Sequence, residues 1–572
     1  MLEKYIEAAL KKVDSDVVLK HANIVNVFSG TITKGDVAIK DDRIVGIGEN
    51  YKGAVEYDCS NKYVLPGLID GHVHIESSML TPEGFASLVM PHGTTTIVAD
   101  PHEIVNVAGL DGLHYMIEAG KRVPLDIKMQ LPSCVPATPF ETSGAIVDGA
   151  STEEEIKNPD VNGLGEFMNF AGVLGCDPDA LRKLEAAHAS NKIVDGHAPM
   201  ITGDALNGYL CGGIVNDHES STIEEMQEKI AKGMYAHLRV GSYTKSLELA
   251  KAITPENSRR VLMCTDDRHA SDIYYNGHLD NALRKTVGAG IDPITAVRMA
   301  TLNCAECYGM KWRGGIAPFY YADIVVVDDL KNFNAELVFK DGKLVAKDGK
   351  ALFDVSVKYL PDAVLNTVHM KDVTADDFKI TLKGAKANVM TTEATGVMTG
   401  LEVMDIESKD GDVCLEGTNL AKLICVERHH MTGNIGKGLI KDYGFKGGAI
   451  GISVGHDSHN LTLIGDDNEC LAKAANTLKE IGGGMVLVSK EEGKTYSVPL
   501  EIGGLMSAVD PMTMVVESKK LADKAYEMGV DRMKEPFFSM EFLSLAVIPH
   551  IRLVDRGLVD VLKWSFIPLD AE

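Results

Sequence analysis

Between Leu65 and Tyr308 the sequence alternates short apolar runs with longer amphipathic stretches, and this alternation constrains the fold more than any other feature. The runs TTTIVAD, NKIVDGH and RRVLMCTDD are typical of buried strands, whereas STIEEMQEKIAKGM and HLDNALRKTVGAG have helical spacing. Roughly 240 residues of alternating strand and helix predict a (β/α)₈ TIM-like barrel. The rival is a doubly wound open sheet, but no G-x-G-x-x-G motif follows the first strand.

Two β-rich segments flank this region. The segment from Val17 to Val64 has turn signals at Ser29-Gly30, Lys34-Gly35 and Asp41-Asp42, which predict a small antiparallel sheet behind an amphipathic N-terminal helix. The segment from Ala322 to Lys350 has two Asp-Gly turns between similar runs. We expect both segments to form one small β-sandwich, with the barrel inserted between its two parts.

Past Lys371 the pattern of predicted strands and helices changes again. The runs FKITLKG, GAIGISVG and MVLVS predict strands, and NECLAKAANTLKEIGGG and MVVESKKLADKAYEMG predict helices, so this part is expected to be a separate α+β domain. The predicted organisation of the α/β chain is residues 1–64 as helix and first sandwich part, 65–315 as barrel, 316–365 as second sandwich part and 366–572 as C-terminal domain.

The composition limits the kinds of molecule that the protein is expected to bind. A formal net charge of -25 argues against nucleic acid or an anionic membrane as partner, because both require a basic face. No segment approaches the roughly 20 apolar residues of a membrane span, and the N-terminal stretch lacks a signal-peptide pattern, so a cytoplasmic location is expected. The ten cysteines are scattered and expected to be reduced. Cys304-x-x-Cys307 lies in ITAVRMATLNCAECYGM, which predicts a helix, and both cysteines are expected to pack in the protein core and not to serve redox or zinc chemistry.

Polar residues close several of the predicted middle strands, where barrel enzymes have their active sites. The first strand ends in His72-Val73-His74, and side chains two apart on a strand share a face, so both imidazoles can point to one metal ion. Later segments close in further ligand-type residues: Glu166, His197, His218 and the pair Asp266-Asp267. Each residue alone is weak evidence, but the joint pattern in strand order predicts a metal site.

That order resembles the amidohydrolase superfamily, through PGLIDGHVH, HGTTT, MATLNCAECYG and GGIAPFYYADIVVVD. Within it, the sequence looks most similar to the adenine deaminases of the bacterial and archaeal type. The phrases that carry this closer resemblance are DPHEIVNVAG, GLGEFMNFAGV, CTDDRH, ERHHMTGNIGKG and GHDSHN, and they extend it over nearly the whole chain.

The resemblance implies a role for each strand-end residue. His72 and His74 would bind one metal ion, Glu166 would bridge two, and His197 and His218 would complete the second. Many relatives use a carbamylated lysine as the bridge, and none is apparent here. Asp266 would bind the first ion and shuttle protons, with Asp267 as the alternative. The donors are nitrogen and oxygen, which suit Mn, Fe or Zn, and the resemblance favours two Mn²⁺ or Fe²⁺ ions.

The implied reaction is hydrolysis of adenine, a small-molecule substrate, to hypoxanthine and ammonia, as in purine salvage. Two metal ions would make hydroxide available near neutral pH, and Asp266 would take up and pass on its proton. The ring nitrogen beside the reacting carbon must also gain a proton, which Glu76 or Glu219 would supply. We therefore assign catalytic roles to Asp266 and Glu219.

Glu76 is the sharper clue to the substrate. Superfamily members with His-x-His-x-Arg use the arginine to pair a substrate carboxylate, whereas an ionised glutamate only accepts hydrogen bonds and suits a heterocycle with N–H donors. Ser77 would contact the base less specifically. His102, in the Asp-Pro-His-Glu turn, is expected either to contact metal or substrate or to have a structural role in the turn, and we assign it with Glu76 and Ser77 to the substrate. Arg239 would shape the pocket or pair with an acid.

The sequence leaves the role of two polar clusters in the C-terminal domain undecided. Residues 427–430 (ERHH) and 456–460 (HDSHN) are expected to close the barrel mouth, to form a second metal site or to make a structural network, and we favour closure. The alternatives for the whole chain are an amidohydrolase acting on another cyclic amide or nitrogen heterocycle, and a catalytically silent scaffold. All six ligand positions are filled, which disfavours the scaffold. The resemblance also implies a homo-oligomer, a dimer or larger.

Overall fold

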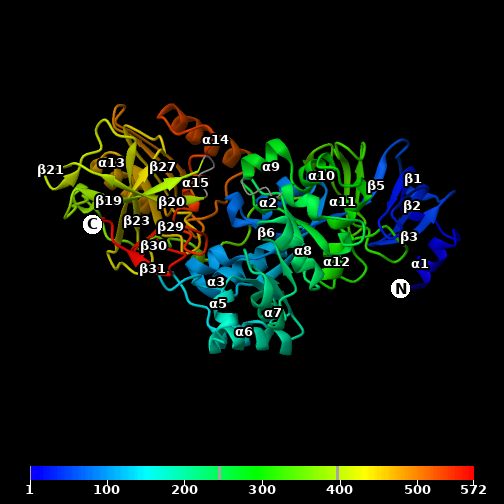
Figure 1. The fold of residues 1–572 in the computed structure, drawn as a ribbon. Coiled ribbons are helices and arrows are strands. Elements are labelled where there is room, and N and C mark those ends of the chain that lie inside the picture. The colour runs from blue at the N-terminus through cyan, green and yellow to red at the C-terminus, as the bar shows by residue number, and fades with distance from the viewer. Residues whose placement is uncertain (1, 243–246, 394–397, 572) are drawn as a thin grey trace.

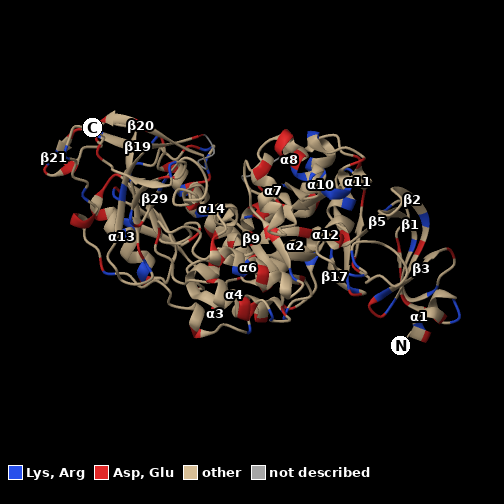
Figure 2. Cartoon of the chain, turned by 60° about the horizontal axis from the view of Figure 1, so that its bottom comes forward, with Lys and Arg blue, Asp and Glu red and all other residues tan. Residues whose placement is uncertain are grey.

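The computed structural model describes residues 2–242, 247–393 and 398–571. Figure 1 shows three regions in a row: an N-terminal sheet at one end, a middle region of strands and helices, and a C-terminal region at the other end. Lysine and arginine are interspersed with aspartate and glutamate along all three (Figure 2). Within the described ranges, no helix is long and apolar enough to cross a membrane.

One hydrogen-bonded sheet joins the segments that flank the middle region. Its strands follow the order β18-β17-β16-β15-β5-β1-β2-β3, with β4 paired to β1, and helix α1 (Leu2–Ala9) packs beside it. β5 pairs antiparallel with β15, so residues before and after the middle region meet in one sheet. The strands are β1 (Ser15–Asn26), β2 (Thr31–Lys40), β3 (Arg43–Gly48), β4 (Gly53–Asp58), β5 (Tyr63–Pro66), β15 (Ile324–Val327), β16 (Ala335–Lys340), β17 (Lys343–Lys347) and β18 (Lys350–Ala351).

Two details of the predicted N-terminal sheet are wrong. The expected turn at Lys34-Gly35 lies inside β2, where Gly35 pairs with Ala22 of β1. The sheet is also not purely antiparallel, because β4 and β5 both run parallel to β1. A glycine within a strand marks a close approach of backbones here, since a Cβ on Gly35 would lie 3.0 Å from the carbonyl oxygen of Gly48.

Parallel strands form a curled sheet in the middle region. β6 pairs with β7, β7 with β8, β8 with β9 and β9 with β10, while β11 pairs with β12, and β12 with β13. Thr265 alone separates β13 from β14, which pairs with β6. On the other side, the Val215 amide before β11 donates to Val194 of β10 at 3.1 Å. The strands are β6 (Leu68–His74), β7 (Thr94–Ala99), β8 (Asp126–Leu131), β9 (Val161–Phe167), β10 (Ile193–Gly196), β11 (Asn216–Asp217), β12 (Tyr235–Arg239), β13 (Val261–Cys264) and β14 (Asp266–Asp267).

Helices connect these strands. The predicted helix through ITAVRMATLNCAECYGM is broken in two, because the backbone leaves helical geometry at Thr301. Cys304 and Cys307 are both buried in the core, in keeping with the packing role expected for them. The helices are α2 (Pro82–Val89), α3 (His102–Gly120), α4 (Gly149–Glu155), α5 (Phe170–Leu174), α6 (Pro178–Ala189), α7 (Gly203–Cys211), α8 (Ile223–Ala231), α9 (Ala270–Asn276), α10 (Leu279–Gly288), α11 (Pro293–Met299) and α12 (Leu302–Cys307).

The C-terminal region contains an eight-stranded sheet in the order β20-β19-β24-β23-β26-β25-β27-β28. Its two longer helices are α13 (Asn468–Glu480) and α14 (Pro511–Glu527), where the sequence predicts them. The expected strand FKITLKG is wrong, because Phe378 ends a 3-10 turn and the next strand begins at Lys386. The sheet strands are β19 (Lys386–Thr392), β20 (Thr399–Asp405), β23 (Leu420–Val426), β24 (Ile435–Lys441), β25 (Gly448–Ile452), β26 (Leu461–Gly465), β27 (Gly484–Ser489) and β28 (Lys494–Pro499). The smaller strands are β21 (Ser408–Lys409), β22 (Asp412–Val413), β29 (Ile551–Val554), β30 (Gly557–Asp560) and β31 (Ser565–Ile567).

A loop of the middle region holds the C-terminal region in place. The Thr142 hydroxyl donates to Asp555 at 2.7 Å, and its carbonyl accepts from Asn460 at 2.9 Å. Phe140 packs edge-on against Trp564 and Phe566, with ring centroids 4.9 and 5.3 Å away. These contacts bring the loop after β25 over the ends of the parallel strands.

Candidate active site

The six residues predicted as ligands come together at the carboxyl ends of the parallel strands. His72 and His74 lie on β6, and Glu166 lies near the end of β9. The others follow β10 and β11 or lie in β14. All six are buried, and we name them the strand-end cluster: His72, His74, Glu166, His197, His218 and Asp266. Parallel strands deliver their carboxyl ends to one edge of the sheet, which explains why residues so distant in sequence meet.

Glu166 lies at the centre of the strand-end cluster. Its Oε2 is 2.8 Å from His197 Nδ1 and 3.1 Å from His218 Nε2. Its Oε1 is 3.2 Å from His102 Nδ1, 3.5 Å from His74 Nε2 and 3.9 Å from His72 Nε2. The two carboxylate oxygens therefore face different histidines, as the oxygens of a bridging carboxylate do.

Asp266 lies beside the histidine pair His72 and His74. Its Oδ1 is 3.3 Å from His74 Nε2 and 3.6 Å from His72 Nε2, and its Oδ2 accepts a hydrogen bond from Arg239 at 2.8 Å. Asp266 has a φ of 60°, in the left-handed region that costs a residue with a side chain about 1–3 kcal/mol. Such strain is concentrated at functional sites, and here it directs the carboxylate toward the histidines.

Asp267, the alternative acid, is turned elsewhere. Its Oδ1 accepts a hydrogen bond from the Ser77 hydroxyl. Burial, together with the negative Asp266, raises the pKa of Asp267 to about 6. The distances favour Asp266 over Asp267 as the member of the strand-end cluster, and they place Ser77 beside the site.

Asp100 orients the strand-end cluster, although the sequence did not single it out. The His74 Nδ1–H donates to the Asp100 carbonyl at 2.8 Å, so Nε2 is left to present its lone pair to the cluster. The Asp100 carboxylate accepts from the Glu166 amide at 2.8 Å. Gly165 permits this approach, since a Cβ there would lie 2.1 Å from Asp100 Oδ2. The position of Asp100 directly after β7 is the signal that would have found it.

The charges in the strand-end cluster favour the binding of cations. Burial opposes charge on His218, yet the contact with Glu166 raises its pKa to about 9. Burial likewise opposes charge on His74, but the neighbouring carboxylates raise its pKa well above its usual value. Without metal ions, the buried carboxylates thus draw protons onto His74 and His218, whereas burial and the neighbouring His218 hold the pKa of His72 well below its usual value. Divalent ions would displace those protons and neutralise the same carboxylates.

Glu219 and Glu76 lie at the margin of the strand-end cluster. Both oxygens of Glu219 accept hydrogen bonds from the Arg239 guanidinium. Glu76 begins the short 3-10 helix η1 (Glu76–Ser78), and its Oε1 accepts from the Ile104 amide at 3.3 Å. Its Oε2 is buried and has no hydrogen-bond partner among the described residues. Burial, with Glu103 nearby, raises the pKa of Glu76 to about 7.

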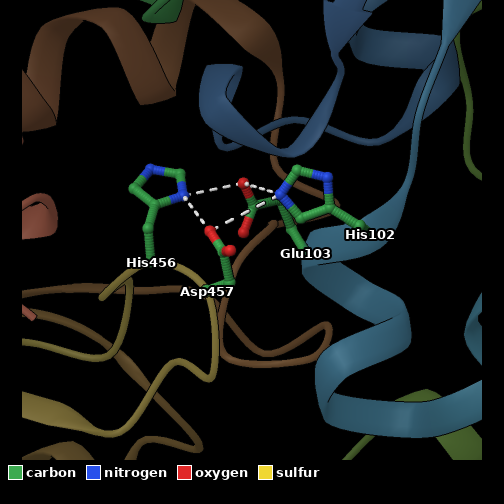
Figure 3. Close-up of side chains that lie close together, drawn as sticks. All are labelled: His102, Glu103, His456 and Asp457. Carbon is green, nitrogen blue, oxygen red and sulfur yellow. Dashed lines mark ion pairs between the residues drawn. The ribbon is translucent and has the colours of Figure 1, made fainter. Parts of the chain in front are cut away.

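A second group of ligand-type side chains adjoins the first. His102 lies with Nδ1 3.2 Å from Glu166 Oε1, and its Nε2 faces away from the strand-end cluster, 3.2 Å from Glu103 Oε1. Two residues of the loop after β25 complete the group, shown in Figure 3. We name it the bridging cluster: His102, Glu103, His456 and Asp457.

The two polar sequences of the C-terminal region have different surroundings. Glu427 accepts hydrogen bonds from the amides of His429, His430 and Thr432, so it stabilises a turn. His456 instead faces Glu103 of the middle region, with its Nδ1 2.7 Å from Glu103 Oε1. Only the second sequence therefore places side chains beside the strand-end cluster.

Comparison with known proteins adds to this geometry. Residues 63–345 match the model of the amidohydrolase family, and residues 396–565 match that of the adenine deaminase C-terminal domain. The chain is 44% identical to adenine deaminase of Clostridium acetobutylicum, over 99% of this chain and 100% of the relative. It is 46% identical to adenine deaminase 2 of Desulfotalea psychrophila (100% and 99%) and 42% identical to adenine deaminase of Geobacillus kaustophilus (100% and 99%).

Proposed function

This chain belongs to the adenine deaminases of the amidohydrolase family, and from that membership we propose that it hydrolyses adenine to hypoxanthine and ammonia. Relatives aligned from end to end at 42–46% identity support the activity. The structural observation that carries it is Glu166, whose two oxygens face different histidines at the strand ends.

The strand-end cluster fits a pair of divalent ions. Its donors are imidazole nitrogens and carboxylate oxygens without a thiolate, which suits Mn²⁺, Fe²⁺ or Zn²⁺, and the resemblance favours the first two. We assign His72, His74 and Asp266 to one ion, His197 and His218 to the other, and Glu166 to both. Bound there, two ions would lower the pKa of a shared water so that hydroxide is available near neutral pH.

The protein's own groups would move the protons. Asp266 lies beside the first histidine pair, and we assign to it the uptake of the water's proton and its delivery to the departing amino nitrogen. Arg239 holds the other oxygen of Asp266 and thereby fixes the direction of the carboxylate. A positioned carboxylate in this role is worth about 10²–10⁴-fold in rate.

Glu76 is the group that fits the purine ring. Its buried Oε2 has no hydrogen-bond partner in the described part of the chain, so it is free to meet a ring N–H. Of the two acids considered for protonating the ring nitrogen, Glu76 fits better than Glu219, whose oxygens are both occupied by Arg239. Ser77 stays a proposed substrate contact, since it lies at the edge of the strand-end cluster. His102 Nδ1 faces Glu166 and its Nε2 faces away from that cluster, so of the two roles considered for His102 we favour a metal contact over a substrate contact.

The architecture proposed to carry this site is an eight-stranded barrel, with β13 and β14 as one strand interrupted at Thr265. The pairing of β14 with β6 and the contact between Val215 and Val194 support closure. The four-part layout of residues 1–64, 65–315, 316–365 and 366–572 and a homo-oligomer are predictions from the sequence.

An ammonia-release assay on adenine, other purines and dihydropyrimidines tests the proposal, using full-length protein reconstituted with Mn²⁺. We expect ammonia from adenine, hypoxanthine in equal amount, and little product from the dihydropyrimidines. A metal-loaded protein that releases no ammonia from adenine would contradict the proposal. Release from another heterocycle alone would reassign the substrate and leave the strand-end cluster as the reaction site.

A further inference from the structure

The bridging cluster is built from two parts of the molecule. His102 and Glu103 form the first turn of α3, whereas His456 and Asp457 come from the loop after β25 in the C-terminal region. All four side chains are buried, with 4% or less of each residue exposed. Figure 3 shows the two carboxylates lying between the two imidazoles.

The donor atoms of the bridging cluster converge as metal ligands do. His102 Nε2 lies 3.2 Å from Glu103 Oε1 and 3.6 Å from Asp457 Oδ1. His456 Nδ1 lies 2.7 Å from the same Glu103 oxygen and 3.9 Å from the same Asp457 oxygen. Ligands about 2.1 Å from a tetrahedral ion are roughly 3.4 Å apart, and the four distances scatter around that value.

These short contacts are not hydrogen bonds. Both oxygens of Glu103 lack a hydrogen-bond partner among the described residues, although imidazole nitrogens lie 2.7 and 3.2 Å from Oε1. The contacts of Asp457 Oδ1, at 3.6 and 3.9 Å, are too long for hydrogen bonds. A buried carboxylate without hydrogen bonds is costly. Lone pairs directed at a common point, instead of at each other, account for contacts of this length without hydrogen-bond geometry.

Each imidazole of the bridging cluster has a carboxylate behind its second nitrogen. His102 Nδ1 is 3.2 Å from Glu166 Oε1, and His456 Nε2 is 3.5 Å from Glu541 Oε2, at the end of α15 (Phe538–Glu541). Histidines that bind metal ions commonly have a carboxylate or carbonyl on the other ring nitrogen, which orients the ring and strengthens the ligand. Both histidines have a carboxylate beside that nitrogen, although neither contact has hydrogen-bond geometry.

The charge around the bridging cluster is one-sided. In the ion pairs of the described residues, Glu103, Asp457 and Glu541 contact histidines and no lysine or arginine. Neutral imidazoles leave three buried carboxylates without a cation, and burying unpaired charge costs several kcal/mol per ion. A divalent cation at the centre of the cluster supplies the missing charge.

We propose that the bridging cluster binds a further divalent transition-metal ion through His102 Nε2, Glu103, His456 Nδ1 and Asp457. This ion is separate from the pair assigned to the strand-end cluster. Two nitrogens and two carboxylate oxygens form a donor set for Zn²⁺, Mn²⁺ or Fe²⁺. Because the ligands come from α3 and from the C-terminal loop, the ion fixes that loop over the strand ends. The inference does not depend on which substrate the protein hydrolyses.

Metal counting tests the inference. Full-length protein is stripped with a chelator, reloaded with Zn²⁺, freed of excess ions by gel filtration and analysed by elemental mass spectrometry. Asp457→Asn and His456→Gln each remove one ligand, and each variant is expected to hold one ion per chain fewer than the wild type. Ser458→Ala changes a buried residue of the same loop that is not a ligand, and it should keep the wild-type number.

Equal ion counts in the wild type and in the folded ligand variants would overturn the inference, and the four residues would then form an imidazolium–carboxylate network. Should both variants fail to fold, a Zn²⁺-loaded wild-type crystal measured at the zinc absorption edge decides. An anomalous peak between His102 and His456 supports the site. Zinc peaks confined to the strand-end cluster overturn it.

Discussion

The strand-end cluster and the bridging cluster use the same residue types but are built differently. The first takes its side chains from the carboxyl ends of parallel strands, so backbone pairing sets its geometry. The second joins the first turn of α3 to a loop of another region, so its geometry depends on how the two regions dock. The first geometry is therefore set within the middle region, whereas the second exists only where the two regions are assembled.

The largest effect is expected from Glu166→Gln, which removes the central carboxylate of the strand-end cluster. The amide cannot bridge two cations, so bound metal should fall and adenine deamination should drop by at least about 10³-fold. Elemental analysis and the ammonia assay measure both quantities.

His237→Gln is the control for Glu166→Gln, because His237 is a buried histidine on β12 that belongs to neither cluster. A Glu166→Gln protein with full metal content and normal activity would contradict the bridging role assigned to Glu166.

Asp266 and Asp267 sharpen the comparison within one strand. Asp266→Asn should reduce kcat by about 10²–10⁴-fold, because it removes the proposed proton carrier. Asp267→Asn should have a smaller effect, since Asp267 Oδ1 is hydrogen-bonded to Ser77. If Asp267→Asn proved the more damaging in steady-state kinetics, the assignment of the two acids would be reversed.

Glu76 lies between the two clusters, with Glu103 on one side and His74 on the other. Glu76→Gln should raise KM for adenine about tenfold, as expected when one buried hydrogen bond to a charged group is lost. Glu83→Gln is the matched control, because Glu83 is a buried glutamate on α2 whose oxygens also lack partners among the described residues. Equal KM values for the two variants would remove Glu76 from the substrate site.

The smallest effect concerns Glu141, in the loop that docks the C-terminal region. Burial, with Asp457 nearby, raises the pKa of Glu141 from 4.5 to about 8. Between those values the folded protein binds more protons than the unfolded chain, so this group lowers stability as pH rises from about 4.5 to 8.

Glu141→Gln should therefore raise Tm relative to the wild type at pH 8.5 by about 2–4 °C, and by less at pH 5. Differential scanning fluorimetry across this pH range measures it, with the exposed Glu154→Gln as control. A constant offset at all pH values would show that Glu141 does not titrate with folding.

The sequence predicts well what a single sheet determines. His72, His74 and Glu166 were found because short apolar runs mark strands and parallel strands end at one edge. The turn at Lys34-Gly35 and the strand FKITLKG were wrong, because local composition does not reveal which partner a segment pairs with. At Lys34-Gly35 the glycine does not mark a turn, because Gly35 lies within β2, where it allows a close approach to the backbone of Gly48.

The bridging cluster is an example of what the sequence does not predict. The sequence predicted that residues 456–460 close the barrel mouth and that His102 contacts metal or substrate, but it did not indicate which side chains of the two segments meet. Glu541 carried no signal at all, and its place beside His456 follows from the docking of α15. Contacts between regions depend on tertiary packing, which periodicity and spacing do not encode.

The sheet that joins β5 to β15 has a consequence for biosynthesis. β5 ends at Pro66, and its partner β15 begins only at Ile324, so the ribosome must make the whole intervening region before that edge is covered. At about 5–20 residues per second the wait is roughly 10–50 s. During that time a nascent chain presents an open strand edge, which is a template for aggregation. Rapid folding of the middle region brings residues 66 and 324 together, and it thereby protects the growing chain.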